Sequence, residues 1–135
     1  MKKPGFGSAA CIIKDKKILL IHRIEDDDEW ELPGGGIDFG ESPEEAAIRE
    51  AKEEVCLKVK SKGLLTVNSH MKTKEKHHIW FYYLCEILEG QEYIGDKAHS
   101  EYKWFTVEVI KKIPNLSIQV KNIISDLENI VKWIK

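Results

Sequence analysis

The stretch that decides the fold runs from Gly35 to Leu57 and reads GGIDFGESPEEAAIREAKEEVCL. Ser42 followed three residues later by Glu45 is a capping-box pattern, and Pro43 stands at the first helical position, where its missing N–H costs nothing. The residues that follow are good helix formers with no breaker. The stretch therefore predicts a helix that begins at Pro43 and continues to Glu54.

This stretch also gathers four glutamates, Glu41, Glu50, Glu53 and Glu54, around Arg49. On a helix, Glu50, Glu53 and Glu54 are three and four residues apart, so their carboxylates converge on one face. Like charges this close repel each other unless a cation neutralises them, and Mg²⁺ prefers oxygen ligands and usually reaches a protein together with phosphate. The pattern favours a phosphate-processing metalloenzyme. The alternative is a solvated acidic helix with intrahelical ion pairs.

The order of residues in the whole stretch resembles the Nudix box, the signature of the Nudix hydrolases. The box pattern is a glycine, five residues, Glu41, seven residues, Arg49-Glu50 and then Glu53-Glu54. The preceding WELPGGG segment, residues 30–36, is similar to the family's usual lead-in. One position departs from the pattern, because Cys56 stands where the family normally has a glycine. A residue with a Cβ adopts the left-handed backbone of a helix end at a cost of roughly 1 kcal/mol.

The resemblance implies hydrolysis of a nucleoside diphosphate linked to another group, with water attacking within the diphosphate. It implies that Gly35, Glu50, Glu53 and Glu54 bind Mg²⁺, with Mn²⁺ as an alternative ion, and that Glu53 and Glu54 are catalytic. Arg49 is expected to orient the loop and the helix by hydrogen bonding. The partner of the protein is then a nucleotide-derived small-molecule substrate, and the number of metal ions stays open.

The general base has three candidates. Glu101 begins the segment EYKWF, residues 101–105, which is similar to a common family pattern before the last strand. Asp96 flanks the same loop, and a box glutamate is the third candidate. His99 lies between the two downstream acids and is expected to be an exposed loop residue.

The sequence leaves several substrate classes open. The small size favours a MutT-like nucleoside triphosphate pyrophosphohydrolase, while ADP-ribose, dinucleoside polyphosphates and sugar nucleotides stay open. Arg23, Phe39, His70 and Tyr82 are candidates to stack on a base or meet a phosphate, and packing or a solvated edge explains each of them equally well. Two other functions remain as alternatives: a Nudix-fold module that senses a nucleotide without hydrolysing it, and an acidic-helix protein that binds a partner without metal.

Length and composition fit one domain over residues 1–135. The chain is 42% hydrophobic and 33% charged, and its net charge of −2 gives no general reason to expect nucleic-acid binding. No apolar stretch approaches the length of a membrane span, and no signal-peptide core follows residues 1–5. Three cysteines without regular spacing indicate reduced thiols, so a cytoplasmic protein is expected, as a monomer or homodimer.

The remaining elements follow from hydrophobic periodicity. Strands are predicted at residues 6–13, 17–23, 30–32, 58–68, 77–88 and 102–106, with the first two as a hairpin. Loops are predicted at 25–29 and 89–98, with a glycine-rich turn at 34–36. Residues 117–133 carry apolar side chains at helical spacing and predict one amphipathic terminal helix. Together these elements predict an α/β fold, an α/β/α sandwich with a mixed β-sheet, which agrees with the Nudix fold.

Overall fold

A computed structural model describes residues 2–24 and 28–134 of the chain. In this part of the chain, seven strands form one sheet in the order β3-β2-β1-β6-β5, with β4 beside β1 and β7 beside β2. The strands are β1 (Gly5–Lys14), β2 (Lys17–Arg23), β3 (Trp30–Glu31), β4 (Gly34–Gly36), β5 (Lys58–Thr73), β6 (Lys76–Glu89) and β7 (His99–Phe105). The helices are α1 (Pro43–Val55), α2 (Val107–Ile110), α3 (Ile118–Lys121) and α4 (Ile124–Trp133). β1 and β6 run parallel and the other pairs are antiparallel, so the sheet is mixed.

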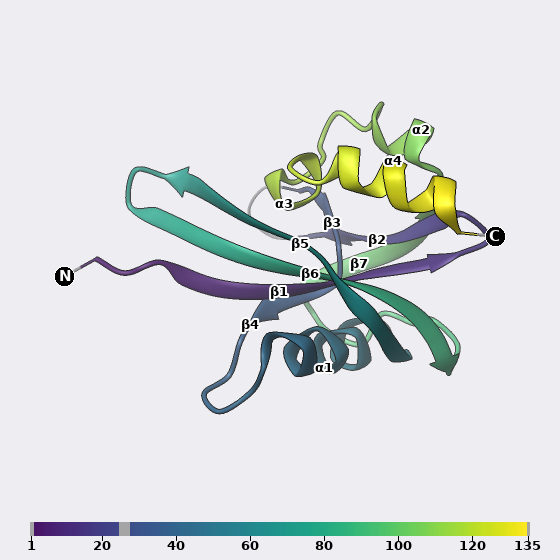
Figure 1. Cartoon of the computed structure of the whole chain (residues 1–135), viewed down its shortest axis with the longest axis horizontal. Coiled ribbons are helices and arrows are strands. Elements are labelled where there is room, and N and C mark those ends of the chain that lie inside the picture. Colours follow the sequence, from purple (N-terminus) through teal and green to yellow (C-terminus); the bar gives the residue numbers. More distant parts are fainter. Residues whose placement is uncertain (1, 25–27, 135) are drawn as a thin grey trace.

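Helices cover both faces of the sheet (Figure 1). α1 lies on one face, and α2, α3 and α4 lie on the other. Because side chains alternate along a strand, β1 supplies residues to two separate cores. Ala10 and Ile12 pack in the core that contains α1, whereas Ala9 and Cys11 pack in the core that contains the C-terminal helices. The predicted α/β/α sandwich is confirmed.

The predicted hairpin between β1 and β2 is also confirmed, although the two strands soon part. Asp15 and Lys16 both have left-handed backbones, with φ of 51° and 61°, as a two-residue hairpin turn of type I′ requires. The strands pair only through Ile13 with Ile18 and Lys14 with Lys17. Beyond these pairs β1 joins β4 and β6, and β2 joins β3 and β7, so the hairpin sends its two strands into different parts of the sheet.

The prediction of one continuous terminal helix is wrong. α3 ends at Lys121 and α4 begins at Ile124, and Ile123 between them has φ −121° and ψ 13°. Val120, Ile123 and Leu127 are all fully buried in the core beneath these helices. Packing against the curved sheet therefore outweighs the continuous helical period of the sequence.

Several other boundaries also differ from the predictions. The predicted glycine turn at 34–36 is strand β4, which pairs with β1. β5 and β6 extend to the tip of their hairpin, because their register continues to Thr73 and Lys76. Helix α2, capped by the side chain of Thr106, was not predicted. In the predicted acidic loop at 25–29, residues 25–27 lie outside the described residues.

No helix in the described ranges is both long enough and apolar enough to cross a membrane.

Candidate active site

Helix α1 begins as the sequence predicts. The Ser42 side chain accepts a hydrogen bond from the Glu45 N–H, and the Glu45 side chain accepts one from the Ser42 N–H, both at 3.0 Å. Ala47 and Ala51 are fully buried against the sheet. The helix is thereby fixed at its start and along its buried face, so its glutamates occupy set positions next to β4.

Glu50 and Glu54 both contact β4. The Gly34 N–H donates to Glu54 Oε1 at 2.7 Å. A Cβ on Gly35 would lie only 2.6 Å from Glu50 Oε1, so the absence of a side chain at position 35 lets this carboxylate lie against the backbone. The Glu50 and Glu54 side chains are 13% and 9% exposed, whereas that of Glu53 is 56% exposed.

Arg49 connects these carboxylates to the loop before the helix. Its guanidinium donates to both oxygens of Glu41, at 2.7 and 3.0 Å, and to the Gly36 carbonyl at 2.9 Å. It also donates to Glu50 at 2.9 Å and lies 3.2 Å from Glu53. The hydrogen bonds from Arg49 hold the pKa of Glu41 below its usual range, so Glu41 stays ionised and the pair braces the loop against the helix.

Burial disfavours the charged forms of both Glu54, which is buried, and Glu50, which is partly buried. Burial raises the pKa of Glu54 to about 8, and the Gly34 N–H and nearby His99 offset only part of this shift. Burial likewise raises the pKa of Glu50, although Arg49 opposes the shift. Carboxylates in such a position are stabilised by a cation with a preference for oxygen ligands. The donor set therefore fits a hard divalent ion such as Mg²⁺.

His99 is buried, and the expectation that it is an exposed loop residue is wrong. It is the first residue of β7, and its Nε2 lies 2.8 Å from Glu31 Oε2 while its Nδ1 lies 3.0 Å from both Asp96 oxygens. Burial lowers the pKa of His99, but the hydrogen bonds to Glu31 and Asp96 outweigh burial and raise it above the ordinary value. Ligand atoms of Glu54, Asp96 and His99 lie within 4.8 Å of one another. No local pattern in the sequence signals the whole cluster, because Glu54 lies on α1 and reaches the other two residues only through the packing of that helix beside the start of β7.

The structure does not bring Glu101 to the glutamates of α1. Tyr102 and Trp104 pack against the core on the α1 side of the sheet. Strand alternation therefore directs Glu101 and Lys103 to the opposite face, where the Lys103 ammonium lies 5.6 Å from the Trp30 ring centroid. Of the two downstream acids, Asp96 is the one that lies beside the buried cluster.

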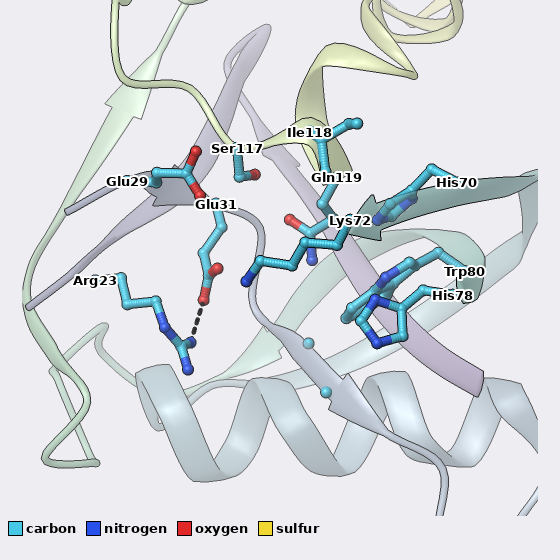
Figure 2. Close-up of a pocket in the computed structure, with 12 residues that line it drawn as sticks. Arg23, Glu29, Glu31, His70, Lys72, His78, Trp80, Ser117, Ile118 and Gln119 are labelled. Atoms are coloured by element: carbon cyan, nitrogen blue, oxygen red, sulfur yellow. Dashed lines mark hydrogen bonds and ion pairs between the residues drawn. The ribbon is translucent and has the colours of Figure 1, made fainter. Parts of the chain in front are cut away.

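A pocket of about 250 Å³ adjoins the glutamates, and Gly34 and Gly35 form part of its wall. Figure 2 shows Arg23 and Glu31 on one side of this pocket and His70, His78 and Trp80 on the other. Ser117, Ile118 and Gln119, from the start of α3, complete the wall. The pocket is therefore lined by charged groups, by aromatic rings, and by the backbone of the two glycines that contact the Glu50 and Glu54 carboxylates.

Two of the four candidates for substrate contact line the pocket, and the other two do not. Arg23 and His70 line the pocket. Tyr82 does not, because it is fully buried and its hydroxyl donates to the Gln119 carbonyl at 2.6 Å. Phe39 is fully exposed in the loop before α1. Tyr82 is thus a packing residue.

Comparison with known proteins identifies the family. The model of the NUDIX domain matches residues 4–127. The chain belongs to the Nudix hydrolase family. As a Nudix hydrolase it is a pyrophosphohydrolase, an enzyme that acts on phosphorus-containing anhydrides.

Named relatives support this assignment. The chain is 35% identical over 126 residues to an ADP-ribose pyrophosphatase of Methanocaldococcus jannaschii, a match that covers 91% of this chain and 72% of that protein. It is 33% identical over 112 residues to diphosphoinositol polyphosphate phosphohydrolase 2 of Mus musculus, over 78% of this chain but only 60% of that relative's length. The crystal structure of a MutT Nudix hydrolase from Burkholderia pseudomallei superposes with a TM-score of 0.83 at 28% identity, covering 93% of this chain and 98% of that chain.

The position where this Nudix hydrolase departs from the box keeps the expected backbone. Cys56 ends α1 in the left-handed conformation, with φ 59° and ψ 27°, and its N–H donates to the Lys52 carbonyl at 3.1 Å. The turn that a glycine normally supplies is therefore formed, at a cost of roughly 1 kcal/mol for the Cβ. Cys11 and Cys85 are buried in the two cores.

Proposed function

We propose that this Nudix hydrolase cleaves the diphosphate of a nucleoside diphosphate linked to another group, in a reaction that depends on a divalent metal ion. The observation that carries the proposal is the junction between α1 and the pocket. Glu50 and Glu54 lie against Gly35 and Gly34, and these same two glycines form part of the pocket wall. A diphosphate held in the pocket would therefore lie next to the carboxylates.

The proposed metal ligands are Glu50, Glu53 and Glu54, with the backbone of Gly35 beside them. The fit rests on the buried Glu54 and the partly buried Glu50, whose pKa values burial raises, so that a cation would stabilise their ionised forms. Mg²⁺, or Mn²⁺ in its place, would screen the anionic diphosphate and stabilise the charge that develops as the bond breaks. Arg49 fixes the helix and the loop that present these ligands.

Glu53 is the proposed residue that accepts a proton from the attacking water. Its side chain is 56% exposed, whereas those of Glu50 and Glu54 are nearly buried, so water reaches Glu53 most readily. Glu101 is the weaker candidate, because strand alternation places it on the other face of the sheet from α1. Asp96 already bonds His99 through both oxygens.

The pocket suits a nucleotide-derived substrate. Trp80 offers an aromatic face, and Arg23 supplies a guanidinium, the group that pairs best with phosphate oxygens. His70 Nδ1 is buried and has no hydrogen-bond partner among the residues that the structure describes, so it is available to a bound ligand. The relative named an ADP-ribose pyrophosphatase favours an ADP-ribose-like substrate, and a nucleoside triphosphate remains the second class. The free thiols of the three cysteines support placing this activity in the cytoplasm.

The test is product release from ADP-ribose, nucleotide sugars, dinucleoside polyphosphates, and unmodified and oxidised nucleoside triphosphates. Each substrate is measured with Mg²⁺, with Mn²⁺ and with a chelator, for the parent, Glu53→Gln and the control Glu44→Gln. Glu44 is an exposed glutamate in the first turn of the same helix. Its substitution is therefore the same chemical change as Glu53→Gln, made outside the site.

The proposal is supported if one substrate class is turned over in a metal-dependent way, if Glu53→Gln abolishes this turnover, and if Glu44→Gln retains it. Hydrolysis by Glu53→Gln at the parent rate would contradict the assignment of the site. Saturable nucleotide binding without turnover in any condition would instead indicate a nucleotide sensor.

A further inference from the structure

We propose that His99 is a positioning residue of this active site, which holds the Glu54 carboxylate in place and joins it to Glu31 in the pocket wall. The inference rests on the proposed function, because Glu54 is one of the proposed metal ligands. The His99 side chain is only 1% exposed, and it connects residues that are far apart in the sequence, since Glu31 precedes it by 68 positions.

The hydrogen bonds of the ring define its role. His99 Nε2 lies 2.8 Å from Glu31 Oε2, and Nδ1 lies 3.0 Å from each oxygen of Asp96. Glu31 thus occupies Nε2 and Asp96 occupies Nδ1, so both ring nitrogens already have carboxylate partners. The ring therefore supports the site instead of binding the ion.

Glu54 is held from two sides. Its Oε1 accepts from the Gly34 N–H at 2.7 Å, and its Oε2 lies 3.8 Å from His99 Nδ1. The loop that carries Asp96 is fixed to the same helix end, because the Gly95 N–H donates to the Glu54 carbonyl at 2.9 Å. Removing the His99 ring would remove the ion-pair contact to Glu54 Oε2, leaving the Glu54 carboxylate with only its hydrogen bond from the Gly34 N–H among the described residues, and would loosen the loop beside it.

The same ring reaches the pocket wall. Glu31 Oε2, which accepts from His99, also lies 3.2 Å from Arg23 Nη1, as the dashed line in Figure 2 shows. Arg23, Glu31, His99 and Glu54 thus form one connected set of ion pairs from the pocket to α1. Loss of the ring should disturb the position of the metal ligand directly and the nucleotide pocket only through Glu31.

The test compares His99→Gln with the matched control His22→Gln. His22 lies on the adjacent strand β2 and also contacts a carboxylate, Asp28 at 2.6 Å, but within residues 2–24 and 28–134 it contacts no glutamate of α1. Supporting residues around metal ligands contribute roughly tenfold to hundredfold to affinity or activity. We expect His99→Gln to lower kcat and to weaken Mn²⁺ binding, followed by EPR without substrate, each by about that factor. The KM for the nucleotide should change by less than about threefold.

His22→Gln should leave kcat and Mn²⁺ affinity within about twofold of the parent. Parent-like kcat and Mn²⁺ affinity in a folded His99→Gln would overturn the inference, while Glu53-dependent turnover of the parent would still uphold the proposed function. If His99→Gln does not fold, Glu31→Gln carries the same test, with losses of kcat and Mn²⁺ affinity in the same direction.

Nitrogen NMR separates positioning from ligation. We expect the side-chain ¹⁵N signals of His99 to show no coupling to ¹¹³Cd when that ion saturates the protein. Coupling of a His99 ring nitrogen to ¹¹³Cd would show that His99 is itself a metal ligand, and the inference would be wrong.

Discussion

Replacing Gly35 by alanine should damage the active site while leaving the fold intact. The new Cβ would lie 2.6 Å from Glu50 Oε1, and ordinary contacts begin at 3.4 Å, so the carboxylate must move by about 0.8 Å. Glu50 cannot relax freely, because Arg49 donates to the same oxygen at 2.9 Å. A misplacement of about 1 Å in an active site costs on the order of a hundredfold in rate, so we expect a kcat loss of about tenfold to hundredfold.

The matched control is Gly36→Ala in the same strand, where the added Cβ would meet no atom within 4 Å. Neither glycine has a positive φ, so alanine is not strained by the backbone at either position. The assay measures kcat with saturating Mg²⁺, together with thermal unfolding, and Gly36→Ala should keep its rate within about threefold of the parent. Parent-like turnover in Gly35→Ala, or an equal loss in Gly36→Ala, would refute the contact argument.

Three further predictions concern single groups. Glu53→Gln should reduce turnover by at least about a hundredfold with an unchanged circular dichroism spectrum, and a parent rate would contradict its role. Tyr82→Phe should lower the free energy of unfolding by about 1 kcal/mol, because it removes the buried hydrogen bond to the Gln119 carbonyl, and should leave kcat unchanged. Burial raises the pKa of Glu54 from 4.5 to about 8, so the folded protein holds this proton more tightly than the unfolded chain does. The contribution of Glu54 to the free energy of unfolding is therefore fully present below pH 4.5 and is lost as the pH rises through about 8. Urea unfolding of the metal-free protein should therefore show less loss of stability between pH 5 and pH 8 in Glu54→Gln than in the parent, and equal losses would count against the shift.

The sequence by itself determined the features that depend on neighbours along the chain. The capping box at Ser42 and Glu45, the helix that follows and the Nudix box on it are all local patterns, and the structure has the helix where the pattern puts it. Cys56 adopts the left-handed backbone that the glycine of the box pattern usually supplies, although its Cβ disfavours that conformation. The apolar run over residues 6–13 likewise predicted a strand, and β1 covers it.

Only the tertiary structure decided what pairs across the sheet. His99 looked like a loop residue, and its burial depends on a β7–β2 register that sets it beside Arg23, with Glu31 and Asp96 at its two nitrogens. The same register sends Glu101 away from α1. Strand pairing and helix packing bring together residues that are tens of positions apart in the sequence. No short-range pattern indicates which of these residues will be in contact. The proposed metal ligands could therefore be anticipated from the local sequence, whereas the residues proposed to hold them in place emerged only from the fold.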